Sequence, residues 1–186
     1  MPLNLRFPWS RQEADPYWDR FINGPLADPA NLPADAIRRA PEGSVFAVQA
    51  DVHTPEIMAG HIKQLAQFFG ADAVAIVRLR PNDDGYPLAV VCALKAEYDP
   101  ERAGGIGGQK AAINGAFVTF NLGSALREYG YRATKRGRDD AERLAAAAGL
   151  GALSGGRLVS PTLGPLYVAD IIHTDIPLAA DGEEPA

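Results

Sequence analysis

The chain has 186 residues, of which 47% are hydrophobic and 22% charged, and its formal net charge is −5 at neutral pH. This composition is typical of a globular domain with a buried core, and the length fits one domain. The acidic balance, without a basic stripe, argues against nucleic acid or an anionic membrane as a partner. Cys92 is the single cysteine. A single cysteine cannot form an internal disulfide, and it cannot by itself provide the ligands of a cysteine-ligated zinc site or an iron–sulfur cluster.

The N-terminal part, residues 1–43, is rich in proline and also contains Trp9, Tyr17, Trp18 and Phe21. Proline removes a backbone donor and restricts the residue before it, so long regular elements are not expected here. The aromatic side chains make this part too hydrophobic for a disordered tail. We therefore predict an arm that lies over a hydrophobic surface, either of this domain or of a partner. An electron-donor protein, a partner subunit or a second copy could fill that role.

The expected location is the cytoplasm, away from any membrane. The N-terminus has no apolar centre of the kind that a secretory signal requires. The longest apolar runs, such as LAVVCAL at residues 88–94, have the length of strands and are too short to span a bilayer.

After the arm, a main domain is predicted over residues 44–180. Residues 44–52 predict a short strand. Thr54 and Pro55 are typical of a helix N-cap and of the first helical position, and the apolar residues that follow recur at helical spacing until Gly70.

Strands and helices continue to alternate along the rest of the chain, which indicates an α/β or α+β sandwich with a mixed, mostly antiparallel sheet and flanking helices. A polar tail is expected at residues 181–186, free of the domain and frayed. The expected elements are strands at 71–80, 88–99, 131–134 and 166–174, a central buried helix at 109–129 ended by Gly130, and a helix at 139–148 ended by Gly149.

Two glycine-rich segments could approach a ligand closely. GGIGG at residues 104–108 precedes a helix and could hold an anion, although it lacks the pattern of a nucleotide-binding loop and could equally be a mobile loop. GLGALSGGR at residues 149–157 has more glycines than one helix C-cap requires. It predicts either a backbone cradle for a large polar ligand, closed by Ser160, Thr162 and Gly164, or a wide turn packed on its own sheet.

Other candidates are single side chains. Glu97, Tyr98 and Asp99 follow a strand, and side chains at this end of a strand face a loop-lined crevice; a solvated strand end is the alternative. His173 is a lone histidine, and a lone histidine more often has a structural role than a catalytic or metal-binding one. Cys92, within an apolar run, is expected to behave as a small buried hydrophobic residue.

The C-terminal third resembles cobalamin-dependent reductive dehalogenases and the related epoxyqueuosine reductases. In that family a helix leads into a GY.A segment, a helix ends in AGLG, a glycine/arginine loop leads to a TP..G segment, and a strand ends in TDLPL. These features correspond here to residues 126–133, 148–151, 155–157, 159–164 and 174–178. The acidic end of VVCALKAEYD, residues 90–99, is also similar to the family.

The resemblance implies a nitroreductase-like fold that holds cobalamin, with a two-electron reduction at cobalt and a proton from a tyrosine, a basic residue or a carboxylate. On this basis the catalytic candidates are Glu97, Tyr98 and Arg157. The implied cofactor-lining residues are Gly149, Leu150, Gly151, Gly156, Arg157, Ser160, Pro161, Thr162 and Gly164.

The family continues past TDLPL into a ferredoxin-like module with two iron–sulfur clusters, and this sequence has no cysteine after Cys92. We therefore expect no iron–sulfur cluster from this chain, and electrons for a small-molecule substrate would come from a separate protein. Two alternatives remain. The chain could be a non-catalytic subunit or binding module of a larger redox assembly, or its nitroreductase-like fold could bind a flavin.

Overall fold

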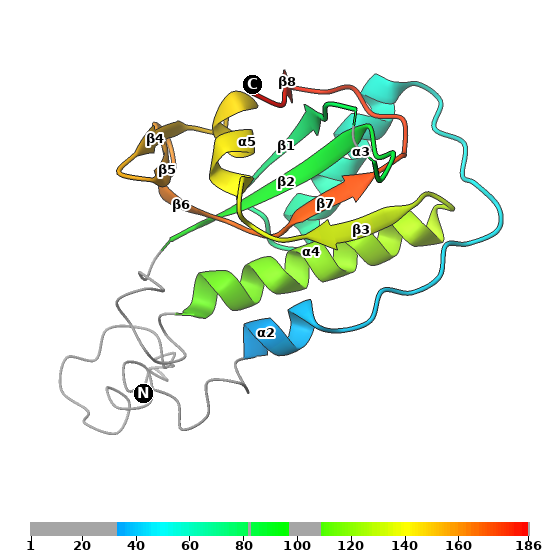
Figure 1. Ribbon diagram of the computed structural model, residues 1–186, viewed down its shortest axis with the longest axis horizontal. Helices are drawn as coiled ribbons and strands as arrows, with labels where there is room; N and C mark the ends of the chain where they lie inside the picture. The colour runs from blue at the N-terminus through cyan, green and yellow to red at the C-terminus, as the bar shows by residue number, and fades with distance from the viewer. Residues whose placement is uncertain (1–32, 82, 97–108, 186) are drawn as a thin grey trace, which may run out of the picture.

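The computed structural model describes residues 33–81, 83–96 and 109–185, which form one layered α+β unit (Figure 1). Four helices and eight strands lie in these ranges. The helices are α2 (Pro33–Arg38), α3 (Pro55–Phe68), α4 (Lys110–Glu128) and α5 (Ala141–Ala147). The strands are β1 (Ala73–Arg78), β2 (Leu88–Lys95), β3 (Ala133–Arg136), β4 (Ala152–Ser154), β5 (Arg157–Ser160), β6 (Gly164–Val168), β7 (Ile171–Thr174) and β8 (Gly182–Glu183).

All strands belong to one mixed, mostly antiparallel sheet with β2 at its centre. Along one edge, β2 pairs with β1, which in turn pairs in parallel with β8. Along its other edge, β2 pairs with β7 and β6, which lie end to end. From there β7 pairs with β3, while β6 continues the sheet to β5 and β4. Beyond β2 the sheet therefore divides into two branches. One runs through β7 to β3, and the other runs through β6 to β5 and β4. The fold class expected from the sequence is confirmed.

The break between β6 and β7 is a β-bulge. Val90 is paired with Ile172, and Ala93 is paired with Val168. An advance of three residues on β2 therefore corresponds to four residues on the opposite side. One extra residue is thus inserted at Ala169–Asp170. A bulge bends a strand and re-aims its side chains. The single last strand predicted for residues 166–174 is consequently two strands that point in different directions (Figure 1).

Both faces of the sheet are covered, which explains why β2 is apolar without alternation. Val90, Cys92 and Leu94 face the larger core, which contains the buried sides of α3 and α4. Val91 and Ala93 face the smaller core beneath α5. Figure 1 shows the same arrangement, with the long α4 and α3 on one side of the sheet and the short α5 on the other. Because α5 has only seven residues, it leaves part of its face of the sheet without a helix.

The predicted start of α3 and the predicted ends of α3, α4 and α5 are confirmed, whereas Asp140 at the start of α5 makes no side-chain capping hydrogen bond. Thr54 Oγ1 accepts a hydrogen bond from the Ile57 N–H at 3.3 Å, and Pro55 begins α3. Gly70, Gly130 and Gly149 follow α3, α4 and α5 with φ of 110°, 82° and 80°. In each case the N–H groups of the glycine and of the next residue bond the carbonyls of the last helical turn. This is the Schellman arrangement, in which glycine adopts the left-handed conformation at little cost.

Two further expectations about local structure were wrong. Residues 44–52 are not a strand, because they run as an extended segment across the C-terminal end of α4. There the Phe46 and Ala50 N–H groups bond the carbonyls of Arg127 and Tyr129, both at 2.9 Å. The polar tail is also not free, because Gly182 pairs with Val77 as part of β8.

The part of the chain that the structure describes has no helix with both the length and the apolar character needed to cross a bilayer. Of the predicted arm, residues 1–32 lie outside the described residues. Its remainder contains α2, which packs against α4. The GGIGG segment, residues 104–108, also lies outside the described ranges.

Candidate functional site

The residues singled out as cofactor-lining come together at one edge of the molecule, where α5 leads into the β4–β5 hairpin (Figure 1). Gly155 and Gly156 form the two-residue turn of this hairpin, with φ of 57° and 79°. Two successive residues with positive φ are the requirement of a type I′ turn, and glycine meets it without steric strain. The backbone thus explains both glycines, and the segment expected as a loop is a short hairpin.

Gly151 makes the close backbone approach that the sequence predicted, but the partner is the chain itself. A Cβ on Gly151 would lie 2.5 Å from the Val159 carbonyl oxygen on the neighbouring strand. By contrast, Gly149, Gly156 and Gly164 have no described heavy atom within 4 Å of a Cβ position. The surface above these three glycines is therefore open on the side where a Cβ would project.

Ser160 fixes the turn between β5 and β6. Its side chain is buried, and its Oγ accepts hydrogen bonds from the N–H groups of Thr162 and Leu163, both at 3.4 Å. The Oγ also lies 3.3 Å from the Thr162 hydroxyl. Pro161 and Thr162 are exposed on the outside of this turn, as is Arg157 at the start of β5, whereas Leu150 is half-buried. The exposed atoms of this edge are therefore backbone groups, a hydroxyl, a proline ring and a guanidinium.

The two catalytic candidates Glu97 and Tyr98 lie outside the described residues, as does Asp99. The strand before them can be followed to Ala96, whose N–H donates to the Pro165 carbonyl at 3.1 Å. Lys95 is paired with Leu166. The C-terminal end of β2 therefore lies beside the start of β6, whose first residue is the cofactor-lining candidate Gly164.

The structure also contains a polar cluster that sequence reasoning missed, formed by Arg38, Tyr167 and Asp170. Arg38 Nε donates to Asp170 Oδ2 at 2.9 Å, and its Nη2 donates to the Tyr167 hydroxyl at 2.7 Å. Burial alone would lower the pKa of Arg38, but the charges of Tyr167 and Asp170 and the hydrogen bonds to both raise it above its ordinary value. The cluster depends on the bulge, because Asp170 occupies the inserted position.

Two further basic residues border this cluster. The Arg138 guanidinium lies 4.1 Å from the centre of the Tyr167 ring, and its Nε donates to the Val168 carbonyl at 2.7 Å. Lys135 Nζ donates to the carbonyls of Ile37 and Arg38 at 3.3 and 3.1 Å, at the C-terminal end of α2. Burial lowers the pKa of Lys135. The cluster is closed by α2, so in this structure it serves to attach that helix.

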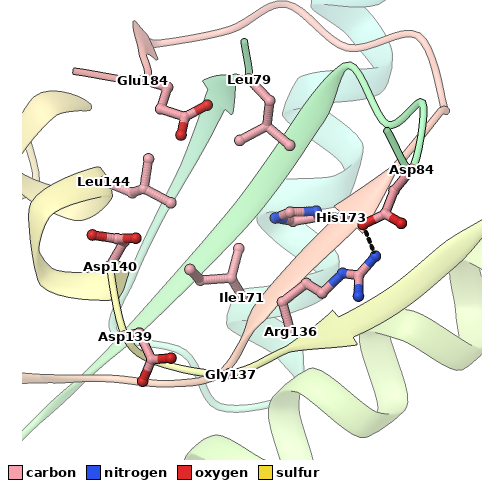
Figure 2. Close-up of a pocket in the computed structure, with 10 residues that line it drawn as sticks. All are labelled: Leu79, Asp84, Arg136, Gly137, Asp139, Asp140, Leu144, Ile171, His173 and Glu184. Carbon is pink, nitrogen blue, oxygen red and sulfur yellow. Dashed lines mark hydrogen bonds and ion pairs between the residues drawn. The ribbon is translucent and has the colours of Figure 1, made fainter. Parts of the chain in front are cut away.

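His173 lies apart from both groups, on the β7 branch of the sheet. Its ring lines a cavity of about 340 Å³ beside α5 (Figure 2). Burial, followed by the charge of Arg136, lowers the pKa of His173 below its ordinary value. Cys92 is fully buried in the larger core, as predicted.

Comparison with known proteins identifies the class of fold. Solved structures of reductive dehalogenases match the chain over 82% of its length, and the chain spans 24% of theirs. The chain has a reductive-dehalogenase-like fold. No family model and no curated protein sequence matches it.

Three of these structures illustrate the match. The catabolic reductive dehalogenase NpRdhA, N-terminally tagged, superposes with a TM-score of 0.66 at 29% identity, and so does the same protein in complex with 3-bromo-4-hydroxybenzoic acid. A reductive dehalogenase whose structure suggests a mechanism for B12-dependent dehalogenation gives a TM-score of 0.65 at 28% identity. The resemblance read from the motifs of residues 126–178 is thus supported by the fold.

Proposed function

We propose that the chain is a reductive-dehalogenase-like domain that binds a corrinoid at the β4–β5 edge and supports a two-electron reduction with electrons from a separate protein. The observation that carries this proposal is the match to a B12-dependent dehalogenase over 82% of the chain at 28% identity. A bound corrinoid would supply two-electron redox chemistry at its cobalt.

The described residues of this edge fit a large, partly polar ligand. The open space above Gly149, Gly156 and Gly164 allows backbone to approach a flat molecule, and a Cβ at any of them would enter that space. Thr162 and Arg157 are exposed beside it and can donate hydrogen bonds. In this proposal Gly149, Leu150, Gly151, Gly156, Arg157, Ser160, Pro161, Thr162 and Gly164 hold the corrinoid. Gly151 and Ser160 act by shaping the hairpin and its turn.

The reduction itself consumes two electrons and one proton. The electrons would come from a separate electron-carrier protein. We assign the proton to Tyr98, Glu97 or Arg157, of which Arg157 lies on the hairpin and the other two follow β2. The Ala96–Pro165 hydrogen bond brings Ala96, the last described residue after β2, next to the turn that carries Thr162.

A purified sample offered hydroxocobalamin and separated by gel filtration tests the proposal. We expect cobalamin to co-migrate with the protein and its visible spectrum to change. Thr162→Trp, which adds bulk on the outside of the turn, should abolish co-migration. Gln67→Trp, on an exposed position of α3 across the sheet, is the matched control and should retain it.

The same experiment with a flavin mononucleotide separates the alternatives. If the flavin binds and cobalamin does not, the cofactor of this domain is a flavin. If neither cofactor binds, the chain is better explained as a non-catalytic subunit. The exposed Phe46 and Val48, at 56% and 67% accessibility, favour a protein partner in that case.

A further inference from the structure

The outer side of α4 lacks the charged residues that an exposed helix face usually carries. Residues 111–126, almost the whole helix, contain no charged side chain. A helix without a charged face is usually buried on all sides, and the sequence predicted that position for α4. In the described part of the chain, however, α4 packs on the sheet with its inner side, while Phe117 on its outer side is 51% exposed. A cover for this outer side is therefore expected.

Two polar side chains of α4 already have hydrogen-bond partners within the helix. Asn121 Nδ2 donates to the Phe117 carbonyl at 2.8 Å, and Ser124 Oγ donates to the Phe120 carbonyl at 2.9 Å. Each bond returns a side-chain donor to the preceding turn of the helix backbone. Burying a polar group is costly only when it lacks a partner. An apolar cover over α4 would therefore leave both of these groups satisfied.

A second exposed aromatic side chain lies where α3 ends against α4. Phe68, the last residue of α3, is 82% exposed, the highest value among the large hydrophobic side chains that the structure describes. Two residues later, a Cβ on Gly70 would lie 3.9 Å from Val118 Cγ2 on α4. Val118 is the neighbour of Phe117, so Phe68 and Phe117 flank the same contact between the two helices. We refer to these two phenylalanines as the α3–α4 surface.

The chain itself contains a segment with the composition to cover this surface. Residues 1–32, which lie outside the described ranges, contain Phe7, Trp9, Tyr17, Trp18 and Phe21. They lead directly into α2, and α2 packs against α4 (Figure 1). The chain that precedes α2 is thus attached beside the helix that needs a cover.

The contacts of α2 place this attachment near Phe117. Lys135 Nζ donates to the carbonyls of Ile37 and Arg38, and the same atom lies 5.3 Å from the centre of the Phe120 ring. Phe117 and Phe120 are three positions apart on α4 and are therefore neighbours on its surface. Because α2 has six residues, it spans only about 9 Å. Its first residue consequently lies within a few helical turns of Phe117.

Two other occupants are less suitable. Residues 97–108, which also lie outside the described ranges, contain one aromatic residue, Tyr98, and four charged ones. A second copy would have to compete with a segment of the same chain, whose effective concentration is about millimolar because it is covalently attached. The residues between Phe21 and Pro33 span up to about 40 Å when extended, so the attachment also allows contact with Phe68.

We propose that the aromatic side chains of residues 1–32 pack on the α3–α4 surface of the same chain, where they continue the cover of α4 that α2 begins. The rings would bury the exposed faces of Phe68 and Phe117 and gain both apolar burial and ring–ring contact. α4 then becomes the buried central helix that its uncharged sequence indicates. This inference does not depend on corrinoid binding.

Tryptophan fluorescence of the full chain tests the proposal, because Trp9 and Trp18 are the only tryptophans in the sequence. We expect their emission to lie at shorter wavelength in the native protein than in the guanidinium-unfolded protein, and acrylamide to quench it more weakly. Equally strong quenching in both states would overturn the proposal. The protection should persist on dilution. Loss of protection on dilution would show that these residues cover a second copy, and it would also overturn the proposal.

Lysine substitutions locate the contact. Phe68→Lys and Phe117→Lys each replace a ring of the α3–α4 surface by a charge, and each should weaken docking about tenfold, the effect of losing the burial of half a phenylalanine. In the double variant, quenching should approach that of the unfolded protein. Leu153→Lys, at a position 47% exposed on β4, is the matched control and should behave like the parent. Circular dichroism establishes that each variant is folded. Parent-like quenching in the folded double variant would mean that the tryptophans are buried elsewhere, and the proposal would be wrong.

Discussion

Arg38 and Asp170, which are 132 positions apart in the chain, form an ion pair with an Nε–Oδ2 distance of 2.9 Å. Arg38 belongs to α2, and Asp170 is the residue inserted by the bulge between β6 and β7. The Asp170 side chain is only 8% exposed. The pair therefore attaches α2 to the central sheet, and it gives a nearly buried carboxylate a guanidinium partner.

Removing that guanidinium should destabilise the protein markedly. Arg38→Met keeps much of the aliphatic packing but leaves Asp170 without its cationic partner and the Tyr167 hydroxyl without its donor. Breaking a buried pair costs 3–5 kcal/mol, and because Arg38 is itself partly exposed we expect about 2 kcal/mol. For a chain of this length that corresponds to a drop of about 5 °C in melting temperature. Arg39→Met is the control, because Arg39 is the adjacent basic residue and is exposed, and its Nε donates to the Asp35 carbonyl rather than to Asp170. Equal losses in both variants would contradict this role of Asp170.

The glycines of the hairpin should respond differently to substitution. Gly151→Val would place a side chain 2.5 Å from the Val159 carbonyl, so β4 and β5 must separate, and we expect a loss of about 3 kcal/mol. Gly156→Ala meets open space and should cost about 1 kcal/mol, from its positive φ alone. Urea unfolding monitored by circular dichroism measures both. Similar losses would mean that the approach of Gly151 to Val159 is not what requires glycine.

Much of the fold could be predicted from the sequence because its signals are local. The Thr54–Pro55 start of α3 and the glycines after α3, α4 and α5 depend on the conformational limits of single residues. The apolar run of β2 likewise indicated a buried strand. Residues 44–52 have the composition of a strand, but their backbone groups bond the end of α4, 79 and 81 positions away in the sequence. This long-range contact prevails over strand propensity.

The candidate sites were harder to predict, because their signals were ambiguous or non-local. The glycines at residues 149–157 have three causes, which are the C-cap of α5, a strand contact and a type I′ turn, and together these look the same in sequence as a ligand cradle. The Arg38–Tyr167–Asp170 cluster depends on a one-residue change of register between β6 and β7, which no local pattern reveals. The cavity at His173 depends on how short α5 is, since a longer helix would cover that part of the sheet.

Cys92 should be an unreactive thiol in the native protein. Burial raises its pKa to about 12, so at pH 8 only about one thiol in ten thousand is ionised. We expect Ellman's reagent to label the native protein very slowly and the guanidinium-unfolded protein rapidly. The single variant Leu153→Cys, which adds a second cysteine at an exposed position on β4, provides the control and should be labelled once without denaturant. Rapid labelling of native Cys92 would show that the sheet opens readily.

His173 should make stability depend on pH in the acidic range. Its pKa is lowered in the folded protein, mainly by burial, whereas the unfolded chain has the ordinary value of about 6.5. Below pH 6.5 the unfolded chain therefore binds a proton that the folded protein resists. Stability should fall as the pH is lowered from 7 towards 5, and it should recover as the pH rises. His173→Phe should flatten this part of the profile in melting experiments. His61→Phe, on the exposed face of α3, should leave it unchanged.

Asp181 should be the residue that holds the C-terminal segment against the sheet. Its Oδ2 accepts from the Ile76 N–H at 2.7 Å, its Oδ1 accepts from Lys63 Nζ at 2.5 Å, and its own N–H donates to the Ile76 carbonyl at 2.7 Å. Asp181→Ala removes the two side-chain bonds and leaves the partly buried Ile76 N–H without its acceptor. We expect a loss of about 1.5 kcal/mol. Amide exchange of Ile76 and Val77 should also accelerate, because β8 is released from β1. Asp139→Ala, at an exposed position just before α5, keeps β8 paired and should leave these two exchange rates unchanged. Faster exchange in both variants would mean that Asp181 does not anchor β8.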